Sequence, residues 1–309
     1  MKSTATANPI LTQLAVKCMQ DPAGFVGLQL FPLFLTAEQS ASYFVMNEEN
    51  FLNIPRNIQR GPGGSYSRSL MKISDDSYNC REFGHEEPVD DRERKKYANS
   101  FDADQAAVNR LVNIIRFNHE ARVRDQATSG AVPTSSPSTK WDAGGSTPIA
   151  DVETAKSAIR KGCGLPANVM IVNIDVFNVL KEHTTIVGKI QYAERAIVTP
   201  QILAAIFGVD KFLVAGAVEN TANEGQALSP SYLWSDSVVL AHAETAQDLM
   251  APNFGRTFAW IGETGPDGVL VETYRQDQIR SDVHRGRQDV DEKIIGAKCG
   301  YHLSNVLAA

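Results

Sequence analysis

The chain has 309 residues, of which 43% are hydrophobic, and its formal net charge is -6 at pH 7. This length allows two or more domains, each with a real core. This net negative charge excludes nucleic-acid binding along the whole chain, because duplex affinity comes mainly from Lys and Arg that neutralise phosphates. No apolar run reaches the roughly 18 residues that span a bilayer, and the N-terminus lacks a signal-peptide pattern. We therefore expect a soluble protein that is made in the cytoplasm and has no membrane partner.

Residues 1–41 are predicted to form an N-terminal arm. Apolar residues recur at helical spacing between Pro9 and Met19, and Pro32 requires an extended path through Phe31 to Phe34. A helix this short is unstable alone. It therefore packs either on a neighbouring molecule or on its own domain, and the sequence leaves both open.

Residues 42–95 are predicted to contain a long two-stranded hairpin. Strand-forming runs at Tyr43–Met46 and Ser65–Leu70 flank a turn. An isolated hairpin is marginally stable in water, so a projecting one needs another surface, whereas a hairpin that lies flat on its own sheet does not. The turn carries glycines that tolerate positive φ, and it comprises Arg60, Gly61, Pro62, Gly63 and Gly64.

A long helix is predicted after a charged segment. The charge run from Glu86 to Lys96 is typical of a solvated loop. Asp102 then caps a helix that runs to about Gln126, some six turns. The periodicity predicts an inward face of Ala107, Val108, Leu111, Ile114, Ile115 and His119, and an outward face of Arg110, Arg116, Glu120, Arg122 and Arg124.

A compact α/β unit is predicted in the middle of the chain. The stretch from Thr128 to Pro148 is rich in Ser, Thr, Pro and Gly, so it is either mobile or a contact loop. The unit itself follows the helix Ile149–Arg160. Its expected elements are a strand at Val169–Val172, a helix capped by Asp175, a helix from Thr199 and Pro200 to a stop at Gly208, and strands at Phe212–Val214, Tyr232–Trp234 and Val238–Leu240.

The last part of the chain is predicted to be strands with a charged turn. Long strands are expected at Phe254–Ile261 and Gly268–Asp282, a turn at Arg285–Arg287, and a last strand at Ile294–Tyr301. Both signs of charge crowd this region, and charge pairs at subunit contacts fix partner and register. We predict intersubunit pairing here, with a solvated hairpin as the alternative. The residues concerned are Arg280, Asp282, Arg285, Arg287, Asp289 and Asp291.

No sequence pattern predicts catalysis, a cofactor or a metal. The glycine pattern from Gly162 to Ala167 follows a helix and precedes a strand, the reverse of a dinucleotide-binding motif, and no phosphate-binding loop occurs. Neither His85 nor His119 has the second histidine four residues later that a zinc site on one helix face needs. The cysteines Cys18, Cys80, Cys163 and Cys299 form no C-x-x-C pair, so reduced thiols are expected.

Several short segments of the sequence carry a resemblance to a known family. They are Pro148–Asp151, Pro166–Val169, Val176–His183, Ile190–Tyr192, Thr199–Val209, Gly216–Thr221 and Trp234. These segments resemble tailed-bacteriophage major capsid proteins, which have the Hong Kong ninety-seven-type fold, and the resemblance covers Tyr43 to Leu307 in element order.

The resemblance implies an α+β fold and a structural role. Residues 1–41 would be the arm, 42–95 the extended hairpin loop region, 96–148 and 255–298 a peripheral domain with a long spine helix, and 149–254 and 299–309 an axial domain. The chain would assemble into hexamers and pentamers of an icosahedral capsid and would contact packaged DNA only weakly. It would be found in the virion. Contacts between copies are expected at Arg60, Gly61, Gly63, Gly64, Arg280, Arg285 and Arg287.

The resemblance also implies further partners. The chain begins almost directly with the arm, so we expect a separate scaffolding protein rather than a fused one, together with a portal and a possible decoration protein. Two alternatives remain at this point. One is an encapsulin-like nanocompartment shell, which has the same fold, and the other is an α/β enzyme whose site is assembled in space.

Overall fold

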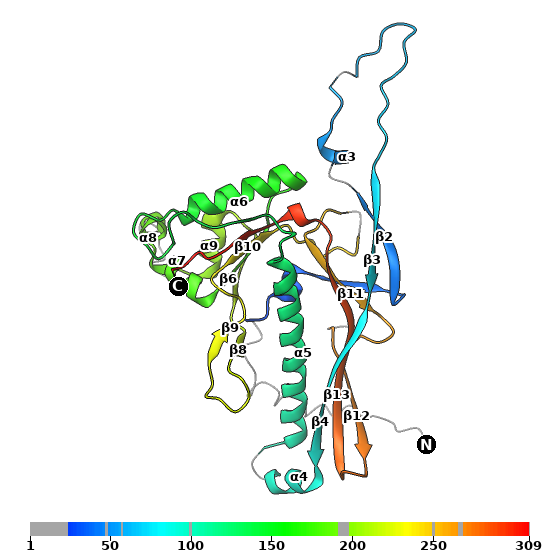
Figure 1. Ribbon diagram of the computed structural model, residues 1–309, viewed down its shortest axis with the longest axis vertical. Helices are drawn as coiled ribbons and strands as arrows, with labels where there is room; N and C mark the ends of the chain where they lie inside the picture. The colour runs from blue at the N-terminus through cyan, green and yellow to red at the C-terminus, as the bar shows by residue number, and fades with distance from the viewer. Residues whose placement is uncertain are drawn as a thin grey trace.

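The computed structural model describes residues 24–46, 49–56, 58–98, 101–190, 198–248, 251–264 and 268–308. Two five-stranded sheets lie on either side of a long helix, α5, and a hairpin rises beyond them (Figure 1). In the part of the chain so described, no helix is both long and apolar enough to cross a membrane. The predicted helix between Pro9 and Met19 lies outside the described residues.

The first sheet has the order β1-β11-β13-β12, and β4 also pairs with β13. The β1–β11 pairing is parallel, and the other pairings of this sheet among the described residues are antiparallel. Helix α5 packs across β13 and β4. The elements are α2 (Gly27–Leu30), β1 (Leu33–Thr36), β4 (Arg81–Asp90), α4 (Asp91–Tyr97), α5 (Ala103–Ala127), β11 (Gly255–Trp260), β12 (Leu270–Gln276) and β13 (Ser281–Ile294).

Helix α5 confirms the predicted long helix, its cap and most of its inward face. The Asp102 carboxylate accepts hydrogen bonds from the backbone N–H groups of Asp104 and Gln105. Leu111 and Ile115 are buried against β13, where a Cβ at Gly286 would lie 2.6 Å from Ile115 Cδ1. The prediction that Glu120 faces outward is wrong, because only 1% of this residue is exposed.

The second sheet has the order β5-β14-β10-β6-β7 and is covered by helices α6 to α9. All residues of β6 and β10 are buried, and apolar clusters fill both faces of the sheet. The elements are β5 (Thr134–Ser135), α6 (Pro148–Cys163), β6 (Val169–Asn173), α7 (Ile174–Glu182), α8 (Thr184–Ile190), α9 (Pro200–Phe207), β7 (Lys211–Ala215), β10 (Val238–Ala241), η2 (Ala297–Cys299) and β14 (Gly300–Leu303).

The helix boundaries of this unit agree with the prediction at one helix and differ at another. Thr199 caps α9 by accepting from Ile202 N–H, and Gly208 ends that helix with φ 62°, as expected. Helix α7 is capped by Asn173, not by Asp175. Because α7 begins directly after β6, the last residue of the strand is the one placed to accept from Val176 N–H, at 2.7 Å.

Four other predicted elements are wrong. The turn predicted at Arg285–Arg287 lies inside the 14-residue strand β13, and the chain turns instead at Asp277–Arg280, where Arg280 has φ 52°. Gly286 is present because α5 approaches closely, not because the chain turns. The strand predicted at Gly268–Asp282 ends earlier, with β12 at Gln276. The strand predicted at Ile294–Tyr301 is interrupted by η2. The segment Glu86–Lys96, predicted as a loop, forms part of β4 and α4.

The projecting hairpin exists, but its strands differ from the prediction. Strand β2 (Ser40–Met46) pairs with β3 (Ile73–Asn79), and a short helix α3 (Glu49–Leu52) follows β2. Ser65–Leu70 is not a strand. The predicted strand Tyr232–Trp234 is shifted to β9 (Pro230–Tyr232), which pairs with β8 (Val218–Asn220), and Trp234 is buried beyond it.

Candidate assembly surfaces

The projecting hairpin ends in a loop, residues 51–72, that extends away from both sheets (Figure 1). At its tip, Gly64 N–H donates to Gly61 O at 3.0 Å, and Gly63 has φ 78°, which favours glycine. The Arg60 Nε donates to Gly64 O at 2.6 Å, and its guanidinium lies over the Tyr66 ring. The structure therefore brings the predicted site residues Arg60, Gly61, Gly63 and Gly64 together in one turn.

The base of this loop is closed by one asparagine. Asn50 Nδ2 donates to Lys72 O at 2.6 Å, and Lys72 N–H donates to Asn50 Oδ1 at 2.8 Å. These two hydrogen bonds join the two sides of the loop, between the end of β2 and the start of β3.

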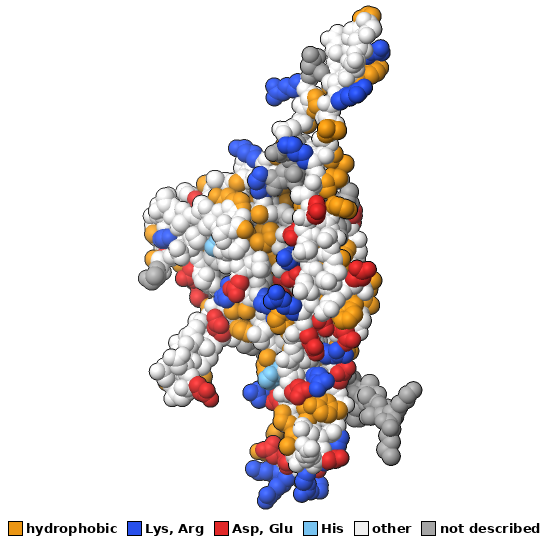
Figure 2. All heavy atoms as spheres, turned by 45° about the vertical axis from the view of Figure 1, so that its right-hand side comes forward, with side chains coloured by type: hydrophobic (Ala, Val, Ile, Leu, Met, Phe, Trp, Pro, Cys, Tyr) orange, Lys and Arg blue, Asp and Glu red, His pale blue; other side chains and the backbone are white. Residues whose placement is uncertain are grey.

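The loop exposes large apolar side chains. Leu70 is 94% exposed, Ile54 75% and Ile58 73%, and Figure 2 shows hydrophobic side chains along this projection. Scattered apolar residues on a surface need no explanation, but several on one thin projection mark a contact surface. The loop is therefore the first candidate for contact with another molecule.

The predicted arginines of the late strands lie elsewhere, on β13 and in the turn before it. Arg285 Nε donates to Glu86 Oε1 at 2.6 Å, and Arg287 pairs with Glu263 and, at 3.1 Å, with Glu272. Both guanidinium groups are thus bound within the chain. Arg280 lies in the exposed turn, where its backbone N–H donates to Asp277 O and its carbonyl accepts from Asp91 N–H, and its side chain makes no hydrogen bond or ion pair with the described residues.

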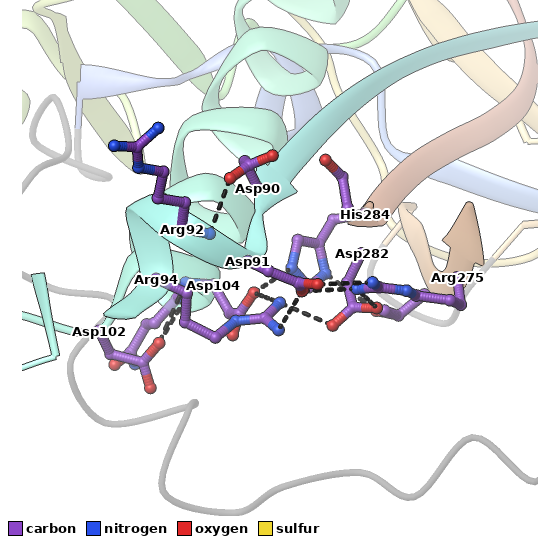
Figure 3. Close-up of polar contacts among 12 residues, drawn as sticks. Asp90, Asp91, Arg92, Arg94, Asp102, Asp104, Arg275, Asp282 and His284 are labelled. Carbon is purple, nitrogen blue, oxygen red and sulfur yellow. Dashed lines mark hydrogen bonds and ion pairs between the residues drawn. The ribbon is translucent and has the colours of Figure 1, made fainter. Parts of the chain in front are cut away.

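A second charged cluster, at the end of the molecule opposite the loop, was missed from the sequence (Figures 1 and 3). Arg94 bridges Asp104 at 2.6 Å and Asp282 at 2.7 Å, and Arg275 binds both carboxylate oxygens of Asp91 at 2.7 Å. Burial alone would raise the pKa of Asp104, but hydrogen bonds from Arg94 and His284 lower it overall. This network joins α4, α5, β12 and β13.

A buried carboxylate at the centre of the molecule was also missed. Glu120 of α5 accepts from Val26 N–H at 3.1 Å, from Gly27 N–H at 2.6 Å and from Trp234 Nε1 at 2.6 Å. Burial raises the pKa of this carboxyl against the effect of its three donors. A Cβ at Gly27 would lie 2.6 Å from Glu120 Oε2. Through these hydrogen bonds, Glu120 links α5 to the start of α2 and to Trp234, which packs in the apolar cluster on one face of the second sheet.

One serine and histidine pair resembles part of a catalytic triad but lacks its chemistry. Ser146 Oγ lies 2.9 Å from His183 Nε2, while Thr185 N–H donates to His183 Nδ1 at 3.3 Å. Because Nδ1 accepts, the ring proton is on Nε2, which donates to the serine instead of taking its proton. Ser146 Oγ in turn donates to Trp141 O. This pair stabilises the loop before α6.

No group of three His, Cys, Asp or Glu residues within the described ranges could hold a metal ion. Cys80 and Cys299 are buried and Cys163 is half-buried, and Cys18 lies outside those ranges.

Comparison with known proteins agrees with this arrangement. No family model matches the chain. The chain is 26% identical over 313 residues to the major capsid protein of Burkholderia phage BcepMu, across 97% of this chain and 96% of that protein.

Solved structures give the same fold. A phage-related protein from Bordetella bronchiseptica RB50 has a TM-score of 0.72 at 23% identity and covers 99% of each chain. The capsid of cyanophage P-SCSP1u has a TM-score of 0.55 at 11% identity, over 89% of this chain and 86% of that one. The fold is thus that of the Hong Kong ninety-seven-type shell proteins. Within this class, the chain is similar to the phage major capsid proteins.

Proposed function

We propose that this protein is the repeated subunit of an icosahedral phage capsid, in which hexamers and pentamers of the chain enclose the genome. The observation that carries the proposal is the likeness to a major capsid protein over nearly the whole of both chains. Heterologous contacts between identical copies close rings when the rotation between copies closes, so one chain suffices to build capsomers. The protein performs no reaction, and its place is the virion.

The division into domains is part of this proposal. Residues 96–148 and 255–298 form the peripheral domain with α5 as its spine, and residues 149–254 and 299–309 form the axial domain. The membership of the two sheets supports this division except at β5, which lies within residues 96–148 but pairs with β14 of the second sheet. Because Trp141 packs into the cluster below α6, we place the first boundary nearer Thr128 than Pro148.

The arm and the projecting loop have the role of holding neighbours together. The exposed apolar residues of the loop support this role, since no described part of the chain covers them. Within residues 42–95, the hairpin and its loop up to Asn79 are the part that reaches over an adjacent subunit, while β4 belongs to the first sheet. A separate scaffolding protein, a portal and a decoration protein complete the proposed set of partners.

The turn before β13 is proposed as a second contact between copies. Arg285 and Arg287 have internal ion pairs there, whereas the Arg280 side chain makes none with the described residues, so we choose Arg280 as the cation that meets another subunit. Arg280→Glu should reduce assembly without loss of folding. Assembly equal to that of the unmodified protein would remove this turn from the proposal.

Electron microscopy of negatively stained samples, with light scattering, tests the proposal. The full chain would be expressed alone and together with the scaffolding protein encoded beside it. Rings, tubes or closed shells in either sample are expected. A dispersed monomer in both would contradict the proposal, and shells filled with an enzyme instead of DNA during infection would favour a nanocompartment.

A further inference from the structure

We propose that the cavity between α2, α5 and the first sheet is a binding site for one small neutral molecule, which has an apolar body of the size of a benzene ring and a single hydroxyl group. Phenol is the simplest member of this class. The inference goes beyond the proposed function, because it concerns the interior of one subunit and not the contacts between subunits.

The cavity is large enough for such a molecule. Its volume is about 130 Å³, and it lies where α2 packs against α5 and β11 (Figure 1). An engineered apolar cavity of roughly 150 Å³ binds benzene. Leu28 is 41% exposed, so one wall of the cavity borders solvent and a ligand can enter there. The apolar side chains that line the cavity are Phe25, Leu28, Leu33, Val269 and Val290.

Three of the polar residues that line the cavity have hydrogen bonds within the chain. The Glu120 carboxylate accepts from three donors. The Thr257 hydroxyl donates, at 3.0 Å, to the backbone carbonyl two residues before β1. The Gln288 amide donates to Gly268 O at 3.2 Å and accepts from Arg122 Nη2 at 2.8 Å. These three residues therefore do not require a ligand.

His119, also in the lining, has a free acceptor. Its Nε2 lies 3.2 Å from Thr257 Oγ1 and 3.6 Å from Glu292 Oε1. Burial lowers the pKa of this ring to about 3, so the ring is neutral and has one N–H. Because the threonine hydroxyl donates elsewhere and the carboxylate only accepts, the proton is on Nε2. Nδ1 is then an acceptor that makes no hydrogen bond with the described residues, in a side chain that is 6% exposed.

Arg116 supplies the matching donor. It precedes His119 by three residues on α5, so both side chains lie on the same face of the helix. The Arg116 side chain is half-buried, lines the cavity and makes no hydrogen bond or ion pair with the described residues. An unpaired polar group in such a place costs free energy that a ligand can recover.

A hydroxyl group satisfies both residues at once. It can donate to His119 Nδ1 and accept from the Arg116 guanidinium, while the apolar body packs on the cavity wall. A carboxylate can only accept, and it would lie near the Glu120 carboxylate. A hydrocarbon can neither donate nor accept. The two unpaired groups therefore select a neutral hydroxyl compound among molecules of this size.

Fluorine NMR of the full, unassembled chain tests the site, with 4-fluorophenol as the probe. The matched ligands are 4-fluorotoluene, which lacks the hydroxyl group, and 4-fluorobenzoate, which carries a charge in its place. Val269→Phe fills the cavity, and Arg116→Leu removes the donor. Arg160→Leu, on the exposed part of α6, is the control. Circular dichroism verifies that each variant is folded, and Arg116→Leu decides alone if Val269→Phe is not.

We expect saturable binding of one 4-fluorophenol per chain and a rise in the melting temperature of the subunit. Arg116→Leu should weaken the affinity about tenfold, the effect of losing one hydrogen bond, and the two matched ligands should bind about tenfold more weakly than the probe. Val269→Phe should abolish binding, and Arg160→Leu should leave it unchanged.

No saturable binding in the millimolar range would overturn the site. Unchanged affinity in Val269→Phe would place the probe elsewhere on the subunit and also overturn it. Equal affinity for 4-fluorotoluene or for 4-fluorobenzoate would overturn the assigned ligand class. None of these results depends on assembly, so each of them leaves the proposed capsid function intact.

Discussion

At the scale of single residues, Glu120 is the most consequential side chain outside the contact surfaces. It is buried and accepts three hydrogen bonds, from the N–H groups of Val26 and Gly27 at the start of α2 and from Trp234. Glu120→Ala leaves three buried N–H donors without an acceptor, at about 1–3 kcal/mol each. We expect the free energy of unfolding of the unassembled subunit to fall by about 3 kcal/mol or more, measured by urea denaturation.

The control for this prediction is Glu182→Ala, which removes an exposed glutamate at the end of α7. Surface substitutions of this kind change stability by about 0.5 kcal/mol or less. Equal losses in the two variants would show that the Glu120 hydrogen bonds do not stabilise the fold.

The buried His119 ring makes the stability of the folded subunit depend on pH. Burial, with Arg122 nearby, lowers the pKa of His119 to about 3, so the folded protein keeps this ring neutral where the unfolded chain protonates it. The unfolded state then binds more protons between pH 6.5 and 3, and stability falls as pH falls, by up to about 1.4 kcal/mol per pH unit.

His119→Asn removes this titration. Between pH 6.5 and 5 we expect the unmodified subunit to lose about 1.5 kcal/mol more than this variant in urea unfolding. The comparison cancels Glu120, whose raised pKa acts in the opposite direction in both proteins. Parallel pH profiles would contradict the assignment of a neutral buried ring.

Periodicity predicted the burial of His119 but not of Glu120, its neighbour on α5. A helical pattern assigns one face to the core, and a charged residue at its edge is placed in solvent. Here the second sheet's layer and α2 cover that edge, and three donors compensate the charge. No single helix pattern contains that information, because the donors come from residues about one hundred positions away.

At the scale of elements, the contact of α5 with β13 depends on Gly286. A Cβ there would lie 2.6 Å from Ile115 Cδ1 and 3.0 Å from Leu111 Cγ, which are both buried. Gly286→Ala should therefore force the helix from the strand and cost about 1–3 kcal/mol in thermal or urea unfolding. Gly130→Ala, with no atom within 4 Å of its Cβ, is the control. A Gly286→Ala variant with unchanged stability would show that α5 and β13 are not closely packed at this position.

The same glycine explains why the late strands were predicted incorrectly. Arg285, Gly286 and Arg287 have the composition of a turn, yet the glycine serves close packing, and the chain turns at Arg280. Elements with local signals were predicted correctly, such as α9 with its Thr199 cap and Gly208 stop. Among the candidate contact residues, the glycines at the tip of the loop could be identified from the sequence, because such a turn requires backbone conformations that favour glycine. The ion pairs of Arg94 and Arg275 could not be identified, because they join segments that are distant in the sequence.

At the scale of the whole molecule, one chain combines a two-sheet body with an unsupported projection. The body can fold without the tip of the loop, because the apolar clusters of the sheets contain none of its residues. Replacement of residues 56–70 by a short Gly-Ser linker should therefore give a folded monomer of nearly unchanged melting temperature that forms no shells. Shells of normal size from this variant, seen by negative-stain microscopy, would show that the loop does not hold neighbours together.

The most direct test of the central claim is a cryo-electron microscopy reconstruction of particles formed by the full chain with its scaffolding protein. The account predicts an icosahedral lattice of hexamers and pentamers, with α5 and both sheets in each subunit and the loop of each copy in contact with an adjacent subunit. Particles without such a lattice, or monodisperse single subunits at every concentration tried, would contradict it.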